Sequence, residues 1–235
     1  MQLTDTILMI RPAAFRYNPE TAANNFFQNP TSLAQHELQE TVLREFDAMV
    51  AALRGRGIDV IVVEDTPEPV KPDAIFPNNW FSTNSLGALN VYPMFAASRR
   101  EEKRDDILQQ LYRDYRVTSV YDWSEFEADN MFLEGTGSMV IDHPNRIVYA
   151  CLSPRTNAVL LEKVASVNGY KAMAFSATDA AGKPVYHTNV IMAIGEGFAV
   201  LCTGSIADEV ERIAVVQLLE STGHRVIPIT HAQIA

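Results

Sequence analysis

The stretch EGTGSMVIDHPNRIVYACLSPRTNAVLLEKVASVNGYKAMAF, residues 134–175, contains one complete structural unit. Two strand-like runs, EGTGSMVID and RIVYACL, flank the turn residues HPN and predict a β-hairpin. An amphipathic helix over 157–168 follows, and Gly169 stands where a helix commonly ends. The run YKAMAF then predicts a further strand, so the unit reads hairpin, helix, strand.

This unit recurs along the chain. Helices followed directly by strands are predicted over 32–54 with IDVIVVE, 99–114 with VTSVY, 157–168 with YKAMAF and 206–221 with HRVIPI. Ser32 and Gln35 are placed as a capping box at the start of the first helix. The three predicted hairpins begin near Asn79, Glu134 and His187, which lie 55 and 53 residues apart. The repeat period is therefore about 54 residues.

A unit of hairpin, helix and strand excludes a doubly wound sheet, in which single strands alternate with helices. Such units bury their faces against one another in a ring or a stack. In a ring, the starts of equivalent strands converge on the axis, so Asn79, Glu134 and His187 are expected to face one another. One further period from His187 reaches about residue 241. We therefore predict one domain over 1–235, a ring short of most of its last unit.

Composition excludes several classes of protein. The chain of 235 residues carries a net charge of −10, which repels phosphate backbones and argues against a nucleic-acid partner. Its apolar runs are far shorter than the roughly 20 residues of a membrane span. Its two cysteines, Cys151 and Cys202, belong to no disulfide or zinc pattern. We predict a cytoplasmic protein with no membrane association, and expect both cysteines, which lie in apolar runs, to be buried and inert.

The first candidate chemical group consists of His187, Glu134 and Asn189. A carboxylate can orient an imidazole for proton transfer, and Asn189 is expected two residues along on the same strand face. The alternative for His187 is a hydrogen-bonded histidine with a structural role only. A metal hydrolase that also uses Asp142 and His143 is a further alternative, but the turn HPN predicts that these two are exposed at a hairpin tip.

The second group is a possible ligand site around Asp73 and Arg155. Asp73 precedes an apolar pair and could accept paired hydrogen bonds from an NH-rich ligand. Arg155 follows a hairpin strand and could bind a ligand carboxylate with two hydrogen bonds. The alternatives are a turn aspartate and a surface arginine.

Several motifs in order resemble the guanidino-group-modifying superfamily, which includes arginine deiminases, dimethylarginine dimethylaminohydrolases and amidinotransferases. The motifs are Asp73 with Phe76, Glu134-Gly135, Ser153-Pro154-Arg155-Thr156-Asn157 and His187-Thr188-Asn189. A closer resemblance is to the citrulline-utilisation hydrolase type. It rests on Ile10-Arg11-Pro12-Ala13, Asn24-Asn25-Phe26-Phe27-Gln28 and Phe76-Pro77-Asn78-Asn79-Trp80.

The resemblance implies a pseudo-fivefold α/β-propeller and covalent catalysis by a cysteine, without a metal or organic cofactor. His187 would shuttle protons with Glu134 as its partner. Asp73, Phe76, Asn79 and Asn189 would contact a guanidino or ureido amino acid, and Arg155 its carboxylate. Deiminase relatives carry acids where this chain has Asn79 and Asn189, so we expect a preference for a neutral ureido group of the citrulline type.

In the family, the nucleophilic cysteine lies near the C-terminus, in the unit that this chain is expected to lack. We therefore expect a C–N hydrolase that is catalytically incomplete as it stands. The alternative is a non-catalytic protein that binds a ligand or a protein partner. Unpaired strand edges of an incomplete ring also predict self-association. The long segment Ala14–Pro30 is predicted to act as a lid, with Phe27 contacting the ligand. The alternative is that Phe26 and Phe27 pack on the ring.

Overall fold

The structure is a computed structural model and describes residues 1–22, 25, 28 and 30–234. The chain divides into two compact units. The N-terminal unit comprises Thr4–Val91 and Ala96–Tyr121, and the C-terminal unit comprises Met1–Leu3, Tyr92–Phe95 and Asp122–Ala235. The single domain expected over 1–235 stays a prediction. The predicted Phe27 contact and much of the predicted lid lie outside the described residues.

Within its described residues, the N-terminal unit contains two small sheets. Its elements in chain order are β1 (Thr6–Arg11), α1 (Pro19–Ala22), α2 (Gln35–Arg54), β2 (Asp59–Glu64), a 3-10 helix (Pro77–Asn79), β3 (Phe81–Thr83), β4 (Ala88–Val91), α3 (Ala97–Arg100), α4 (Asp105–Asp114) and β5 (Ser119–Asp122). Strands β1 and β2 pair in parallel, and β3, β4 and β5 form the second sheet in that order. Phe46 and Val50 on one face of α2 pack against Val60 of β2.

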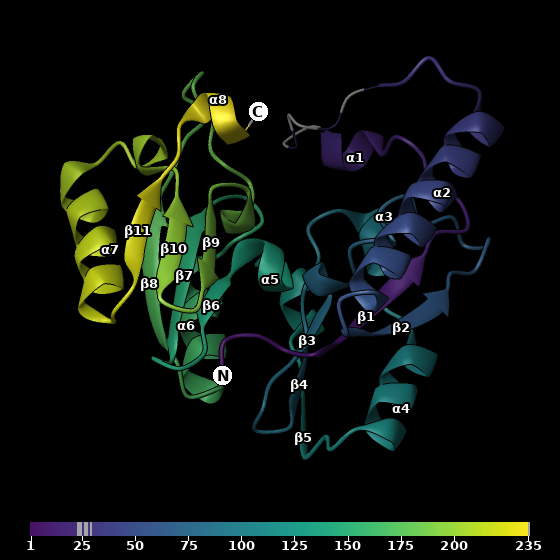
Figure 1. Cartoon of the computed structure of the whole chain (residues 1–235), viewed down its shortest axis with the longest axis horizontal. Helices are drawn as coiled ribbons and strands as arrows, with labels where there is room; N and C mark the ends of the chain where they lie inside the picture. Colours follow the sequence, from purple (N-terminus) through teal and green to yellow (C-terminus); the bar gives the residue numbers. More distant parts are fainter. Residues whose placement is uncertain (23–24, 26–27, 29, 235) are drawn as a thin grey trace. The chain divides into compact units, whose positions relative to one another are not determined.

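The C-terminal unit contains two three-stranded sheets of the same topology (Figure 1). Its elements are a 3-10 helix (Ser124–Glu127), α5 (Gly135–Ser138), β6 (Val140–Asp142), β7 (Ile147–Leu152), α6 (Ala158–Val167), β8 (Lys171–Ser176), a 3-10 helix (Thr188–Val190), β9 (Met192–Gly195), β10 (Phe198–Leu201), a 3-10 helix (Thr203–Ser205), α7 (Glu209–Ser221), β11 (Arg225–Pro228) and α8 (His231–Ile234). In each sheet the hairpin strands are antiparallel, and the strand after the helix pairs in parallel with the second hairpin strand.

One apolar core joins the two sheets of the C-terminal unit. It includes Tyr149, Phe175, Leu201 and Leu219, which are fully buried. A glycine with left-handed backbone stands two residues after the last residue of α6 and of α7, Gly169 at φ 75° and Gly223 at φ 87°. This conformation is accessible to glycine without a steric penalty, which explains why glycine stands there. The predicted order of hairpin, helix and strand is confirmed here.

The N-terminal unit corrects two predicted helix bounds. Helix α2 begins at Gln35, and its N-cap is Ala34, so the predicted Ser32–Gln35 capping box is wrong. Instead, the Glu37 carboxylate accepts the Ala34 N–H at 3.2 Å. The helix expected over 99–114 is interrupted between α3 and α4, because Arg104 adopts extended backbone and donates to the Glu64 carbonyl and to Asp106.

The three hairpins are each preceded by a short helical turn, which the alternating sequence pattern did not predict. Glu134 and His187 are the residues immediately before their turns, and Phe76 holds that position in the first hairpin. Asn79 is the last residue of its turn. The predicted equivalence of Asn79 with Glu134 and His187 is therefore wrong by three residues, because the turn separates these side chains from the strand.

None of the helices in the described part of the chain is both long enough and apolar enough to cross a membrane.

Candidate functional site

A hydrogen-bonded frame in the C-terminal unit holds the loop that carries Glu134. Glu134 precedes α5, and its N–H donates to Ser138 Oγ at 2.9 Å. Ser138 Oγ in turn donates to the Arg155 carbonyl at 2.9 Å, and Thr188 Oγ1 donates to the Ser138 carbonyl at 2.6 Å. Loops from three parts of the sequence are thus tied to one short helix. This frame fixes the backbone of Glu134, Arg155 and His187 relative to one another.

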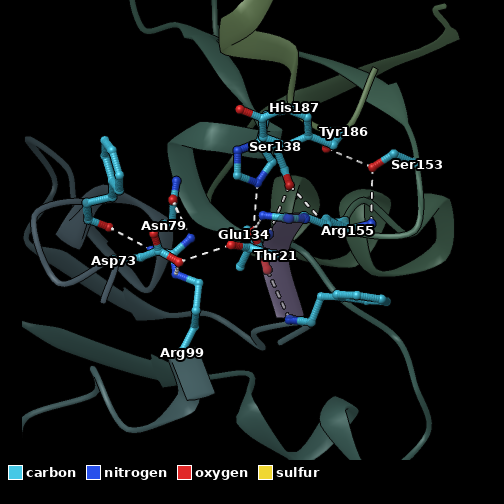
Figure 2. Close-up of polar contacts among 12 residues, drawn as sticks. Thr21, Asp73, Asn79, Arg99, Glu134, Ser138, Ser153, Arg155, Tyr186 and His187 are labelled. Atoms are coloured by element: carbon cyan, nitrogen blue, oxygen red, sulfur yellow. Dashed lines mark hydrogen bonds and ion pairs between the residues drawn. The ribbon is translucent and has the colours of Figure 1, made fainter. Parts of the chain in front are cut away.

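The Glu134 carboxylate is the centre of this cluster (Figure 2). Its Oε2 lies 2.7 Å from His187 Nε2 and 3.3 Å from Arg155 Nη1, and its Oε1 accepts the Phe95 N–H at 3.0 Å. Glu134 is 0%, Arg155 2% and His187 4% exposed. Charges interact more strongly at such sites than in water. The structure therefore brings Glu134 and His187 together as the sequence predicts, while their catalytic role stays a prediction.

Arg155 is held from two sides. Its guanidinium carbon lies 4.9 Å from the centre of the Tyr186 ring, and the Tyr186 ring lies 4.7 Å from the His187 ring. Ser153 Oγ donates to the Tyr186 carbonyl and accepts the Arg155 N–H. Arg155 is thus not the surface arginine that the alternative envisaged. Its predicted contact with a ligand carboxylate stays a prediction.

Asn189 does not share a strand face with His187, so that expectation is wrong. It lies in the 3-10 helix Thr188–Val190, where successive side chains turn by about a third of a circle. Its side chain is exposed whereas His187 is buried. A binding role for Asn189 stays a prediction.

A second polar cluster lies in the N-terminal unit, around Asp73. The Asp73 carboxylate accepts hydrogen bonds from Asn18 Nδ2 at 2.7 Å and Thr21 Oγ1 at 3.3 Å. Arg99 Nε lies 3.9 Å from the same carboxylate. Asp73 is half-buried and Phe76, three residues on, is exposed. Asp73 is therefore a positioned acceptor, as an NH-binding group requires.

Arg99 and Glu102 are part of this cluster, although the sequence pattern predicts neither of them there. Arg99 Nε and Nη2 donate to the two Glu102 carboxylate oxygens at 2.9 Å each. Arg99 Nη1 donates to Asn79 Oδ1 at 2.8 Å (Figure 2). Arg99 and Glu102 are 2% and 1% exposed. Their only signal in the sequence is the opposite charge at a spacing of three, inside the run SRREEKR that resembles a solvated surface.

Asp142 and His143, which the sequence predicts to be exposed at the tip of the hairpin β6–β7, are at least partly buried. Asp142 is fully buried rather than exposed, and its carboxylate accepts hydrogen bonds from the Asn145 backbone and side chain. His143 is half-buried, and its Nδ1 lies 2.8 Å from Tyr170 Oη. Burial lowers the pKa of His143. Both side chains therefore have structural partners of their own.

Both cysteines are fully buried, which confirms that part of the prediction. Cys151 lies in β7, and burial raises the pKa of its thiol to about 11. Cys202 follows β10 directly. Neither thiol is accessible to a ligand in this conformation.

We expect the two thiols of the native chain to react with a disulfide reagent at least about 100-fold more slowly than those of the unfolded chain, because reaction requires an accessible thiolate. The measurement is absorbance of the released chromophore at pH 8, in buffer and in concentrated urea. If one thiol per native chain reacted with the reagent as fast as in the unfolded chain, this expectation would be wrong.

Solved structures of similar fold include arginine-modifying proteins. Apo ArgZ, an arginine dihydrolase from cyanobacteria, has a TM-score of 0.68 and 13% identity over 97% of this chain and 30% of ArgZ. AgrE in its ternary complex with ornithine and NAD⁺ has a TM-score of 0.74 and 15% identity over 98% of this chain and 31% of AgrE. DDAH from Pseudomonas aeruginosa, complexed with citrulline, has a TM-score of 0.59 and 14% identity over 97% of this chain and 92% of that one.

These likenesses confirm the expected fold class, an α/β-propeller of repeated hairpin, helix and strand units. The chain spans about a third of the length of the ArgZ and AgrE chains. No curated protein sequence matches it at a significant level. The family model described as N,N dimethylarginine dimethylhydrolase, eukaryotic, matches residues 11–235. The chain therefore belongs to the N,N-dimethylarginine dimethylhydrolase family, within the guanidino-group-modifying superfamily that its motifs resemble.

Proposed function

We propose that the chain is the acid–base and ligand-binding part of a hydrolase that acts on the C–N bond of a guanidino or ureido amino acid. The buried contact of 2.7 Å between His187 Nε2 and Glu134 Oε2 carries this proposal. Supporting it, a cysteine-to-alanine mutant of AgrE has been solved with L-arginine and a cysteine-to-serine mutant of the Pseudomonas aeruginosa DDAH with citrulline.

His187 is assigned the proton transfers. With its Nε2–H donating to the Glu134 carboxylate, the neutral imidazole presents Nδ1 as the basic nitrogen. A cysteine thiol gives its proton to His187 Nδ1, and the resulting thiolate attacks the central carbon of the ligand. The leaving amine then takes that proton from the His187 imidazolium. Water then attacks the same carbon and gives a proton to His187 Nδ1, and the carbon–sulfur bond breaks. Glu134 stabilises the imidazolium in both steps.

Neither Cys151 nor Cys202 is assigned as the nucleophile, since both are fully buried and the Cys151 thiol has a raised pKa. These are the two cysteines of the sequence. The nucleophilic thiol is then supplied from outside residues 1–235. The same burial favours a second candidate function, a non-catalytic protein that binds the same ligand class. Self-association and a cytoplasmic location stay predictions.

The test combines an intact-mass measurement of the native gene product with an ammonia-release screen over arginine, citrulline, dimethylarginine and agmatine. Turnover of one of these, lost on alkylation of a cysteine other than Cys151 and Cys202, supports the hydrolase. Micromolar binding of one ligand by calorimetry, without turnover, would establish the binding protein instead.

The complete enzyme is expected to prefer citrulline over arginine, and Asn79→Asp should shift that preference toward arginine by about 10- to 100-fold. The reason is that a carboxylate only accepts hydrogen bonds and suits a cation, whereas the amide also donates one. A charge-assisted hydrogen bond contributes roughly 1.5 to 3 kcal/mol. The measurement is the ratio of kcat/KM for the two substrates. A wild-type ratio that favours arginine, unchanged by the substitution, contradicts the assignment of Asn79.

A further inference from the structure

We infer that Arg99, held by Glu102, fixes the orientation of the Asn79 amide and thereby makes the chain select a ligand carbonyl over a ligand N–H. This inference rests on the proposed function, because it assumes that Asn79 contacts the ligand. It assigns the selectivity to two residues that themselves need not contact the ligand.

The orientation of the amide follows from the chemistry of its partner. Arg99 Nη1 lies 2.8 Å from the Asn79 amide. A guanidinium has donors only, so the amide atom that faces it is the oxygen and not the nitrogen. The reverse orientation would place two N–H groups against each other. The Asn79 Nδ2 donors are therefore on the side away from Arg99.

Arg99 is itself held in place, which makes the orientation a property of the fold. Its guanidinium donates hydrogen bonds from Nε and Nη2 to the two carboxylate oxygens of Glu102. Its Nη2 also lies 3.4 Å from the Phe76 carbonyl oxygen. Phe76 is the residue immediately before the 3-10 helix that carries Asn79. Since Arg99 and Glu102 are both buried, water screens this pair little. A rotation of the Asn79 amide would break the bond to Arg99 without a replacement donor from the pair.

The Asn79 Nδ2 donors are available to a ligand. Within the described residues, Nδ2 donates to no protein acceptor. A ureido group offers a carbonyl oxygen that these donors can bond. A guanidinium offers only N–H groups, so the same contact would set donor against donor and leave both unpaired. By orienting the Asn79 amide, the Arg99–Glu102 pair thus disfavours binding of a guanidinium ligand.

The decisive variant replaces the buried pair with apolar side chains of similar length, Arg99→Met with Glu102→Met, so that neither charge of the pair is left buried without the other. The Asn79 amide can then rotate and present its oxygen to a cation. We expect the ratio of the dissociation constants for citrulline and arginine, measured by calorimetry on the whole chain, to move toward arginine by about tenfold, the size of one misplaced hydrogen bond. Circular dichroism checks the fold of each variant.

The matched control is Arg113→Met with Asp114→Met, which removes an exposed Arg–Asp pair with two contacts of 2.8 and 3.2 Å. It should leave the ratio unchanged. If the double methionine variant at Arg99 and Glu102 does not fold, Arg99→Lys serves instead. Lysine keeps the charge opposite Glu102 but lacks the fork that bonds Glu102 and Asn79 together, so the same shift is expected.

The outcomes separate the two proposals. Wild-type chain that binds neither arginine nor citrulline overturns the ligand class proposed above. Wild-type chain that binds arginine more tightly than citrulline leaves that class intact and overturns the inference about Arg99. Wild-type chain that prefers citrulline, with a ratio that stays the same in folded variants of Arg99 and Glu102, overturns the inference about Arg99 alone. A shift shared by the Arg113 and Asp114 control also overturns it, because the effect would then be one of charge at a distance.

Discussion

Replacing His187 by alanine is expected to lower turnover of the native gene product by about 10²- to 10⁴-fold, the usual contribution of a positioned proton-transfer group. The fold should persist. Without the imidazole, the Glu134 carboxylate still accepts the Phe95 N–H and contacts Arg155. The loss of unfolding free energy should therefore stay within the range of about 0.5 to 3 kcal/mol that is usual for a point mutation. The measurements are kcat and a urea-unfolding curve.

His143→Ala is the matched control for this prediction. His143 belongs to the same unit, is half-buried and lies within hydrogen-bond distance of Tyr170 Oη. Its removal should leave kcat unchanged. If His187→Ala instead destabilised the protein strongly and changed the rate little, His187 would be a structural histidine, the alternative that the sequence left open.

The repeated unit could be predicted from the sequence because its signals are local. Alternation of apolar residues, turn residues between strands and a glycine after each helix act over a few neighbours, and Gly169 and Gly223 have the left-handed backbone that such glycines permit. The burial of Cys151 and Cys202 follows in the same way from the apolar runs around them.

The short turns before the hairpins could not be predicted in this way. A turn of three or four residues is too short to show a helical period, so the alternating pattern predicts the wrong repeat position for Asn79 and the wrong face for Asn189. Buried charges were missed for another reason. A hydropathy pattern predicts that Arg99, Glu102 and Asp142 are solvated. Their burial is possible because hydrogen bonds to residues that lie nearby in the fold offset the cost of removing them from water.

The Glu134 carboxylate shows the same dependence on partners. It is fully buried between the guanidinium of Arg155, the imidazole of His187 and the N–H of Phe95. Taking a carboxylate and a guanidinium out of water costs several kcal/mol for each ion, and their mutual attraction offsets that cost only while both are present. Removing one member of the pair therefore leaves the other ion buried, with its full desolvation cost no longer offset.

Glu134→Ala is accordingly expected to reduce the free energy of unfolding by about 3 to 5 kcal/mol, because it deprives the buried Arg155 of this carboxylate and the Phe95 N–H of its acceptor. Glu134→Gln keeps an oxygen acceptor of the same shape and loses only the charge, so its loss should be smaller. Urea-unfolding curves measure both, and Glu162→Ala, which removes an exposed glutamate of α6, should stay within about 0.5 kcal/mol of wild type. If Glu134→Ala were as stable as Glu162→Ala, the Glu134 cluster would not hold the C-terminal unit together. The Glu134 carboxylate of the wild type would then be solvated and mobile, and it could not be the fixed partner that the proposed role of His187 requires.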